Sequence, residues 1–238
     1  MLRIEKLIYR NLNTFLLIII TTIVLIILYK LFFDKNKKTK KNSIMIIGPS
    51  GSGKTTFFYF LLGHKNVQTV VSMQINKVEN FATELLSNIN SYDIIDIPGT
   101  GYFKDKIMEL LPNTIILLLF IDSTQKNSII QAAEYLYDLL NSDKYNEDLN
   151  LYVCCNKQDG GFPKSKKMIE NELTKEIENL IKIKQKNNLD DKEQIGTLFQ
   201  IKGKFSFKMF SNVTFLETDM KSEYKNITKK IKDTLEIE

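Results

Sequence analysis

A run of eight residues carries the strongest chemical signal in this sequence. Residues 48–55 read Gly-Pro-Ser-Gly-Ser-Gly-Lys-Thr and satisfy every position of G-x-x-x-x-G-K-[ST], a pattern that binds phosphates. Its glycines let backbone N–H groups turn inward onto the phosphates, at the positive end of the helix that follows. Lys54 is expected to reach the β- and γ-phosphates, and the Thr55 hydroxyl to bind Mg²⁺. The pattern predicts a bound nucleoside triphosphate without saying which one, held by Gly48, Ser50, Gly51, Ser52, Gly53, Lys54, Thr55 and Thr56.

A second motif, Asp-Ile-Pro-Gly at residues 96–99, ends an apolar run. Asp96 stands where a carboxylate would hold Mg²⁺ through water, and the Gly99 N–H could contact a γ-phosphate. The sequence between these two motifs should supply a hydroxyl to the same metal ion. Thr69 and Ser72 are the candidates, and we favour Thr69.

A third motif, Asn-Lys-Gln-Asp at residues 156–159, selects the base. The Asp159 carboxylate can accept hydrogen bonds from guanine N1–H and from the exocyclic N2 amine, a donor pair that adenine lacks. Asn156 suits guanine N7, and the aliphatic stem of Lys157 can pack along the base. Three motifs in this order predict a site for GTP and Mg²⁺.

The elements that must position these motifs alternate between strands and helices. Buried apolar runs at 44–47, 114–121 and 149–155 predict strands, and apolar residues at helical spacing predict helices around 129–140, 169–180 and 224–235. This alternation predicts an α/β fold: a P-loop GTPase domain at 43–238 with a mostly parallel central sheet and helices on both faces. The polar segment 182–196 is expected to be a mobile insertion.

The amino-terminal segment is apolar. Residues 11–29 hold no charge, and an extension to Phe33 gives a span long enough to cross a bilayer. Bulky residues at 29–33 argue against a cleaved signal peptide, and the lack of a charged face argues against an interfacial helix. We therefore expect a single transmembrane anchor at 1–33 and a basic linker at 34–42. The linker lysines place the domain in the cytosol.

Composition excludes other chemistry. Lys and Arg exceed Asp and Glu by 33 to 28, but this excess gathers in the linker, so direct nucleic-acid binding is not expected. The single histidine, His64, supports neither a metal centre nor a serine-type triad and is expected in an exposed loop. Adjacent strand residues point to opposite faces, so the only cysteines, Cys154 and Cys155, should not bridge.

The motifs together resemble the signal recognition particle receptor beta family, relatives of the Arf and Sar small GTPases. The resemblance covers nearly the whole chain and rests on Gln68–Ser72, Asp96–Gly99, Phe120–Ser123, Ala133–Tyr137, Cys155–Asp159, Lys164–Lys166, Gly203–Phe207 and Phe215–Glu217. It implies a single-pass protein of the endoplasmic reticulum membrane with a cytosolic GTPase domain. It also implies GTP-dependent binding of the receptor alpha subunit, for cotranslational protein targeting.

Two positions depart from that family. Thr100 stands where a longer His or Gln would follow the Asp-x-Pro-Gly motif, and Asp219 replaces a small residue in the segment that supports guanine. No arginine lies between Gly48 and Asp159, so hydrolysis is expected to be no faster than about 10⁻⁴ s⁻¹. A second hypothesis is therefore a tether that stays bound to GTP. A third, an ATP-driven enzyme, conflicts with the Asn-Lys-Gln-Asp motif. Tyr102 and Phe103 are expected to form an exposed pair on the partner surface.

Overall fold

The computed structural model describes residues 17, 19–25, 42–64, 67–83, 87–145, 148–187, 198 and 204–237, in two units, Met1–Lys40 and Lys41–Glu238. In the first unit, residues 17 and 19–25 are helical and their apolar side chains are exposed. Within the described ranges, no helix is both long and apolar enough to cross a membrane. The rest of the predicted span and nearly all of the predicted linker lie outside these ranges.

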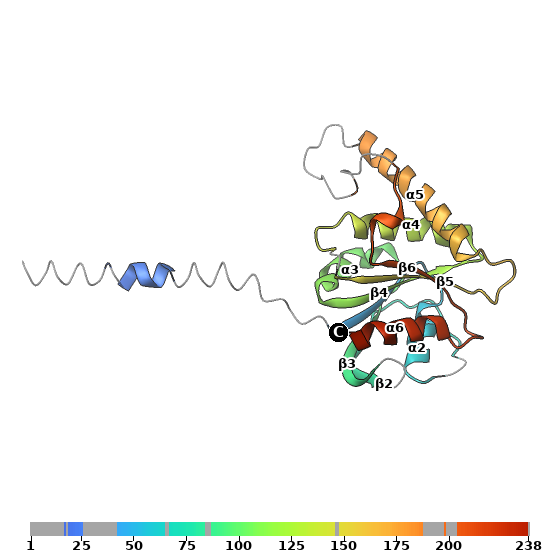
Figure 1. Ribbon diagram of the computed structural model, residues 1–238, viewed down its shortest axis with the longest axis horizontal. Coiled ribbons are helices and arrows are strands. Elements are labelled where there is room, and N and C mark those ends of the chain that lie inside the picture. Colours follow the sequence, from blue (N-terminus) through green and yellow to red (C-terminus); the bar gives the residue numbers. More distant parts are fainter. Residues whose placement is uncertain are drawn as a thin grey trace, which may run out of the picture. The chain divides into compact units, whose positions relative to one another are not determined.

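The second unit is built on a six-stranded sheet with the order β2-β3-β1-β4-β5-β6 (Figure 1). All neighbouring strands are parallel except β2 and β3, which are antiparallel. The predicted mostly parallel sheet is thus confirmed. The strands are β1 (Ser43–Ile47), β2 (Asn76–Thr83), β3 (Ser87–Asp96), β4 (Thr114–Asp122), β5 (Asn150–Asn156) and β6 (Val213–Glu217).

Helices cover both faces of this sheet, so every residue of β1 and β4 is buried and both strands are mostly apolar. Residues that alternate along these strands enter two separate cores, one against α3, α4 and α5 and one against α2 and α6. Cys155 belongs to the first core and Cys154 to the second, and both are free thiols, as predicted. The helices are α2 (Lys54–Leu61), α3 (Lys104–Leu110), α4 (Lys126–Leu140), α5 (Lys166–Asn187) and α6 (Lys225–Ile237), with short 3-10 turns η2 (Gly101–Phe103), η3 (Leu111–Asn113) and η5 (Phe207–Met209).

The parallel register brings the polar ends of the strands to one edge of the sheet. Ile46 pairs with Asp96 across β1 and β3, and Asp122 pairs with Asn156 across β4 and β5. The residue after β1 is Gly48, the first residue of the phosphate-binding motif. All three predicted motifs therefore meet at the carboxyl edge of the sheet.

Several local expectations differ from the structure. The edge strands β2 and β6 and helix α3 were not predicted. Helix α5 continues to Asn187, so it includes the first residues of the segment predicted as an insertion; residues 188–196 of that segment lie outside the described ranges. Tyr102 is 88% exposed as expected, but Phe103 is half-buried and packs against the core, so the prediction of an exposed pair is wrong for Phe103.

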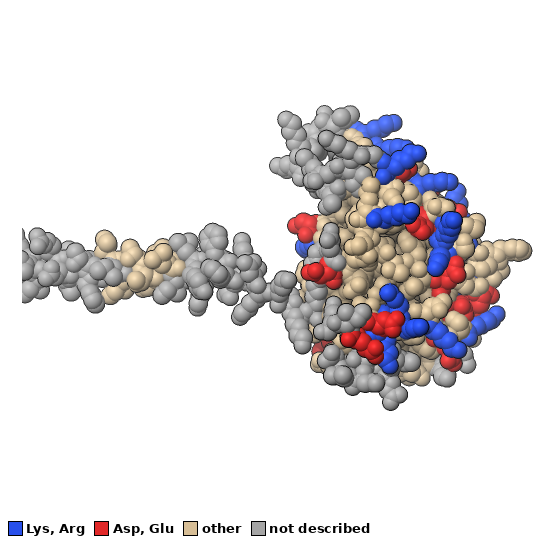
Figure 2. Space-filling view, viewed as in Figure 1, with Lys and Arg blue, Asp and Glu red and all other residues tan. Residues whose placement is uncertain are grey.

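The charged side chains are unevenly placed on the face shown in Figure 2, where Lys side chains are dense over α5 and acidic side chains lie among them. Among the described charged residues of α5, every lysine is exposed, whereas the glutamates are only partly exposed. The exposed lysines of α5 are Lys166, Lys167, Lys175, Lys182, Lys184 and Lys186.

Candidate nucleotide-binding site

The phosphate-binding loop connects β1 to α2 and has the close backbone approaches that its glycines predict. Gly53 adopts a left-handed φ of 96°, and a Cβ there would collide with the side chain of Asn156. Gly99 lies against the same loop, where a Cβ would collide with the Ser50 N–H and the Gly48 carbonyl. The Asp-Ile-Pro-Gly motif and the phosphate-binding loop are therefore in direct contact.

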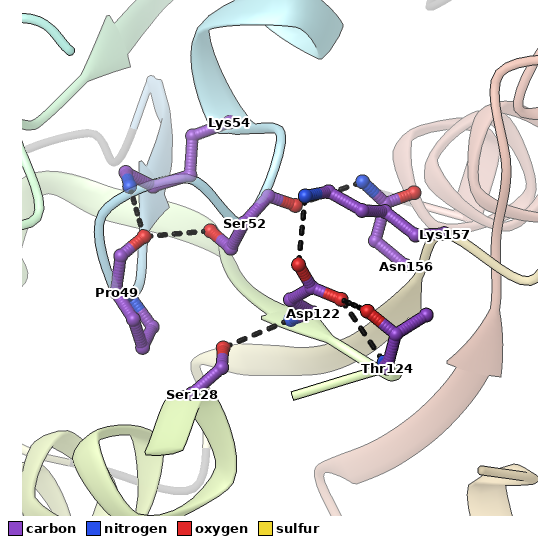
Figure 3. A network of polar contacts seen from close by, with 8 residues as sticks. All are labelled: Pro49, Ser52, Lys54, Asp122, Thr124, Ser128, Asn156 and Lys157. Carbon is purple, nitrogen blue, oxygen red and sulfur yellow. Dashed lines mark hydrogen bonds and ion pairs between the residues drawn. The ribbon is translucent and has the colours of Figure 1, made fainter. Parts of the chain in front are cut away.

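Lys54 is almost fully buried within its own loop, at 5% exposure. Its Nζ donates to the Pro49 carbonyl at 2.7 Å, and the Ser52 hydroxyl donates to the same oxygen at 2.8 Å (Figure 3). Burial lowers the pKa of Lys54 to about 8, although the charge of Asp96 opposes this shift. A phosphate would give this ammonium the anionic partner that a single carbonyl does not.

The metal-binding side of the site centres on Asp96. Its Oδ2 accepts from the Thr55 hydroxyl and from the Asn76 amide, each at 2.9 Å. Its Oδ1 is buried and has no partner among the described residues. Burial raises the pKa of this carboxyl, which the two hydrogen bonds and the charge of Lys54 only partly offset. A buried, unpaired carboxylate oxygen beside a threonine hydroxyl fits a Mg²⁺ ion with its coordinating water.

The two hydroxyls considered as the further metal ligand lie in different places. The Ser72 Oγ is 3.0 Å from the Thr55 Oγ1, whereas the Thr69 Oγ1 is 3.0 Å from the Thr56 Oγ1 and Thr69 is exposed. Both residues line a cavity of about 270 Å³. The structure thus brings Ser72, which the sequence placed second, to the predicted metal-binding threonine. The rest of the lining is Ser50, Gly51, Gly53, Lys54, Thr55, Thr56, Val70, Val71, Pro98, Gly99 and Lys157.

At the other end of the site lies the base-reading loop, residues 156–160, which carries the Asn-Lys-Gln-Asp motif. Its first residue, Asn156, links this loop to the phosphate-binding loop. Its Nδ2 donates to the Ser52 carbonyl at 2.8 Å (Figure 3). Its Oδ1 accepts from the Thr218 hydroxyl at 3.2 Å. Asn156 was expected to contact guanine N7. In the structure its buried amide joins three chain segments and fixes their spacing, while the contact with guanine N7 stays a prediction.

Asp159, the predicted base reader, is exposed and makes no hydrogen bond within the described part of the chain. It lies near Tyr224, whose pKa rises to about 12 through burial first and then through the charges of Asp159 and Asp219. Asp219, one of the two departures from the family pattern, turns its carboxylate onto its own loop and accepts from the Ser222 N–H at 2.6 Å. It therefore closes a turn and leaves Asp159 as the carboxylate available to a base.

Sequence reasoning missed two residues of this site, Asn76 and Asp122. Asn76 opens the unpredicted strand β2 and contacts Asp96. Asp122 ends β4, is 2% exposed, and accepts from the Lys157 Nζ at 2.7 Å. The signal for Asp122 was present, because a carboxylate directly after a continuous apolar strand is costly to bury without a partner.

Comparisons with known proteins agree with this geometry. The family model described as signal recognition particle receptor beta subunit matches residues 39–213. The beta subunits from Mus musculus and Homo sapiens are 31% and 30% identical over 141 residues, which are 56% of this chain and 50% of each relative. The chain thus spans about half the length of these curated relatives.

Solved structures share the fold. A structure of the mammalian signal recognition particle receptor has a TM-score of 0.66 at 24% identity, covering 81% of this chain and 99% of that chain. The Chaetomium thermophilum receptor SRb-GTP/SRX complex has a TM-score of 0.55 at 20% identity, covering 76% and 90%. The SRb-GDP-Mg structure from the same organism has a TM-score of 0.56 at 20% identity, covering 77% and 91%. With a family match over most of its length, the chain belongs to the signal recognition particle receptor beta subunit family.

Proposed function

We propose that this chain is a membrane-anchored subunit that binds GTP with Mg²⁺ and, in that state, holds the receptor alpha subunit at the endoplasmic reticulum membrane. One observation carries the proposal: Lys54, the unpaired Asp96 Oδ1 and the exposed Asp159 gather at one edge of one sheet. These groups match triphosphate, metal ion and guanine in the order in which GTP presents them.

The phosphate end would rearrange its own contacts on binding. Lys54 would exchange the Pro49 carbonyl for phosphate oxygens, and the Thr55 hydroxyl would turn from Asp96 toward the metal ion. Asp96 would hold a metal-bound water, and Ser72 is the nearest additional hydroxyl. When bound, Mg²⁺ neutralises charge on the β- and γ-phosphates. The SRb-GTP/SRX and SRb-GDP-Mg structures of relatives support this choice of ligands.

The base end would discriminate by hydrogen bonding. Asp159 would accept from guanine N1–H and from the N2 amine, while adenine would leave the carboxylate unpaired. Lys157 lines the cavity beside the phosphate-binding loop, which suits its stem to one face of the base.

An apolar surface beside the cavity suits a partner protein. Val70 and Met73 are 88% and 87% exposed, Val71 is 61% exposed, and Tyr102 follows the Asp-Ile-Pro-Gly motif at 88%. Both segments contact or line the phosphate end, so their positions would respond to the γ-phosphate. The SRX partner named in the complex of a relative supports the alpha subunit as occupant. Equal affinity of the alpha subunit for the GTP- and GDP-loaded protein would refute the GTP-dependent part.

Membrane attachment rests on the uncharged, apolar composition of residues 11–29, which the span continues to Phe33 with Lys30 as its one charged residue. Protease added to sealed microsomes should digest the nucleotide-binding domain and spare a short amino-terminal piece. Full protection of the domain would contradict the cytosolic orientation.

A constitutively GTP-bound tether is the second candidate, and Thr100 favours it. Its side chain is exposed and too short to position a water against the γ-phosphate, and no arginine follows Arg10 in the sequence. Chromatography of the nucleotide retained by the purified protein separates the candidates. Retained GTP favours the tether, retained GDP a cycling switch, and retained ATP would refute both.

A further inference from the structure

The end of β4 at Asp122 and the turn that follows it, at Ser123 and Thr124, pack against the base-reading loop. Both carboxylate oxygens of Asp122 are used: Oδ2 accepts from the Lys157 Nζ at 2.7 Å, and Oδ1 accepts from the Thr124 N–H at 3.0 Å and its hydroxyl at 2.6 Å. Figure 3 shows this carboxylate between Lys157 and Thr124, with the Asp122 N–H donating to the Ser128 hydroxyl. Burial raises the pKa of Asp122, but the hydrogen bonds from Lys157 and Thr124 outweigh burial and lower the pKa below its ordinary value. The carboxyl is therefore ionised at neutral pH.

Lys157 reaches Asp122 because its backbone takes an unusual shape. Its φ is 63°, in the left-handed region that residues with a Cβ rarely adopt, and its carbonyl accepts from the Gly160 N–H at 3.0 Å. The tight turn directs the Lys157 ammonium back toward β4 while Asp159 remains exposed. The ion pair therefore fixes a residue that also lines the cavity.

Further contacts fasten the same loop to the same turn. The Ser123 N–H donates to the Asn156 carbonyl, the Lys164 N–H donates to the Ser123 carbonyl, and the Gln158 amide donates to the Ser123 hydroxyl, at 2.9–3.0 Å. A Cβ at Gly160 would come within 2.9 Å of the Thr124 methyl, so the loop passes close to the turn at this glycine. The loop is therefore held at both its start and its end.

We propose that Asp122 is the positioning residue of the base-reading loop. It fixes the Lys157 ammonium and, through it, the Lys157 stem that covers the base. Asp122 thereby sets the lifetime of bound guanine nucleotide. This inference rests on the proposed guanine-nucleotide binding. An ion pair exposed at both partners would contribute little to such a task. Here the Lys157 side chain is 40% exposed, but the Asp122 carboxylate is buried, so leaving it without its partner is costly.

The test is the dissociation rate of N-methylanthraniloyl-GDP from the full chain in detergent, measured by fluorescence after excess GDP is added. Asp122→Asn keeps the size and the acceptor for Thr124 but removes the charge, and should speed dissociation about tenfold. Asp138→Asn is the matched control, because Asp138 accepts from the Lys104 Nζ at 2.8 Å on the partly exposed surface of α4. Its rate should stay within about twofold of wild type.

A double variant separates positioning from general damage to the fold. If Asp122 acts through Lys157, then Lys157→Met should also speed dissociation, and Asp122→Asn combined with Lys157→Met should be no faster than Lys157→Met alone. If the rate increases of the two single variants multiplied in the double variant, the inference would be overturned. So would a lowered melting temperature of Asp122→Asn together with an unchanged dissociation rate.

Two further measurements keep the test decisive. IDP lacks the N2 amine that Asp159 would read, so Asp122→Asn should speed the dissociation of labelled IDP and labelled GDP by the same factor; an effect confined to GDP would overturn the assignment. If Asp122→Asn does not fold, Thr124→Val keeps both charges and removes one donor to the carboxylate, and an unchanged rate would overturn it. Wild type that binds no guanine nucleotide would refute the proposed function itself, whereas tight binding with no effect of Asp122→Asn refutes only this inference.

Discussion

The two ends of the candidate nucleotide-binding site are built in opposite ways. At the phosphate end, the charged groups are buried and bond to neutral groups of the site, as Lys54 does with the Pro49 carbonyl and Asp96 with the Thr55 hydroxyl. At the base end, the reading carboxylate of Asp159 is exposed while the groups behind it, Asp122 and Asn156, are buried and bonded. The phosphate end must therefore exchange contacts when it binds a ligand, whereas the base end is already arranged.

The largest expected effect is at the phosphate end. Lys54→Met should weaken GTP binding by about 3 kcal/mol, roughly a hundredfold, because the charged hydrogen bonds to two phosphates are lost. The nucleotide-free protein should unfold at the same temperature or higher, since a buried ammonium is replaced by an apolar chain. Titration calorimetry and thermal unfolding measure the two quantities. Lys104→Met, on the outer surface, is the control, and a loss of nucleotide-free stability in Lys54→Met would contradict this view of the loop.

A smaller loss is expected at the base end, with a change in specificity. Asp159→Asn should cost about 1.5–3 kcal/mol of GDP affinity and improve binding of XDP, because the amide can donate where the carboxylate accepted. Unfolding of the nucleotide-free variant should match wild type because Asp159 is exposed. Competition between GDP and XDP measures the switch, and unchanged GDP affinity would remove Asp159 from the site.

The metal side allows a direct comparison of two hydroxyls. Ser72→Ala should raise the Mg²⁺ concentration needed for half-maximal GTP binding about tenfold, and Thr69→Ala by less than about twofold, since only Ser72 lies beside Thr55. A Mg²⁺ titration of GTP dissociation gives both values. The reverse order would show that the segment rearranges to bring Thr69 to the metal, as the sequence alone favoured.

The phosphate end and the sheet could be predicted from the sequence because their constraints are local. A strand buried on both faces needs a continuous apolar run, as β4 shows, and the phosphate-binding loop has a fixed spacing between Gly48 and Thr55. The edge strand β2 could not be found in this way. Its sequence, Asn-Lys-Val-Glu-Asn-Phe-Ala-Thr, is mostly polar because it lies at the edge and pairs only with β3.

The base end was predictable only in part because its support is not local. The Asn-Lys-Gln-Asp motif identifies the segment that reads the base, but the partner of Lys157 is Asp122, on the neighbouring strand and far away in sequence. The same holds for Ser72 and Thr69, because the choice between them depends on how the segment folds back onto α2. Pairings across strands are set by the register of the sheet, which the sequence pattern did not specify.

The smallest expected effect concerns Thr100. Hydrolysis requires a water aligned with the γ-phosphate, and the chemistry depends mostly on positioning and on charge stabilisation. Lys54 and the metal-binding Thr55 can supply charge, but Thr100 is exposed and short, and the sequence after Arg10 contains no arginine. Single-turnover hydrolysis by the purified chain should therefore not exceed about 10⁻⁴ s⁻¹, and Thr100→Ala should change that rate by less than about twofold.

The matched control is Ser165→Ala, which removes an exposed hydroxyl directly before the start of α5. A wild-type rate near 10⁻² s⁻¹ would reveal a water-positioning group elsewhere in the chain, and a large loss in Thr100→Ala would identify Thr100 as that group. The proposed asymmetry of the site would then extend to catalysis, with the phosphate end doing chemistry as well as binding.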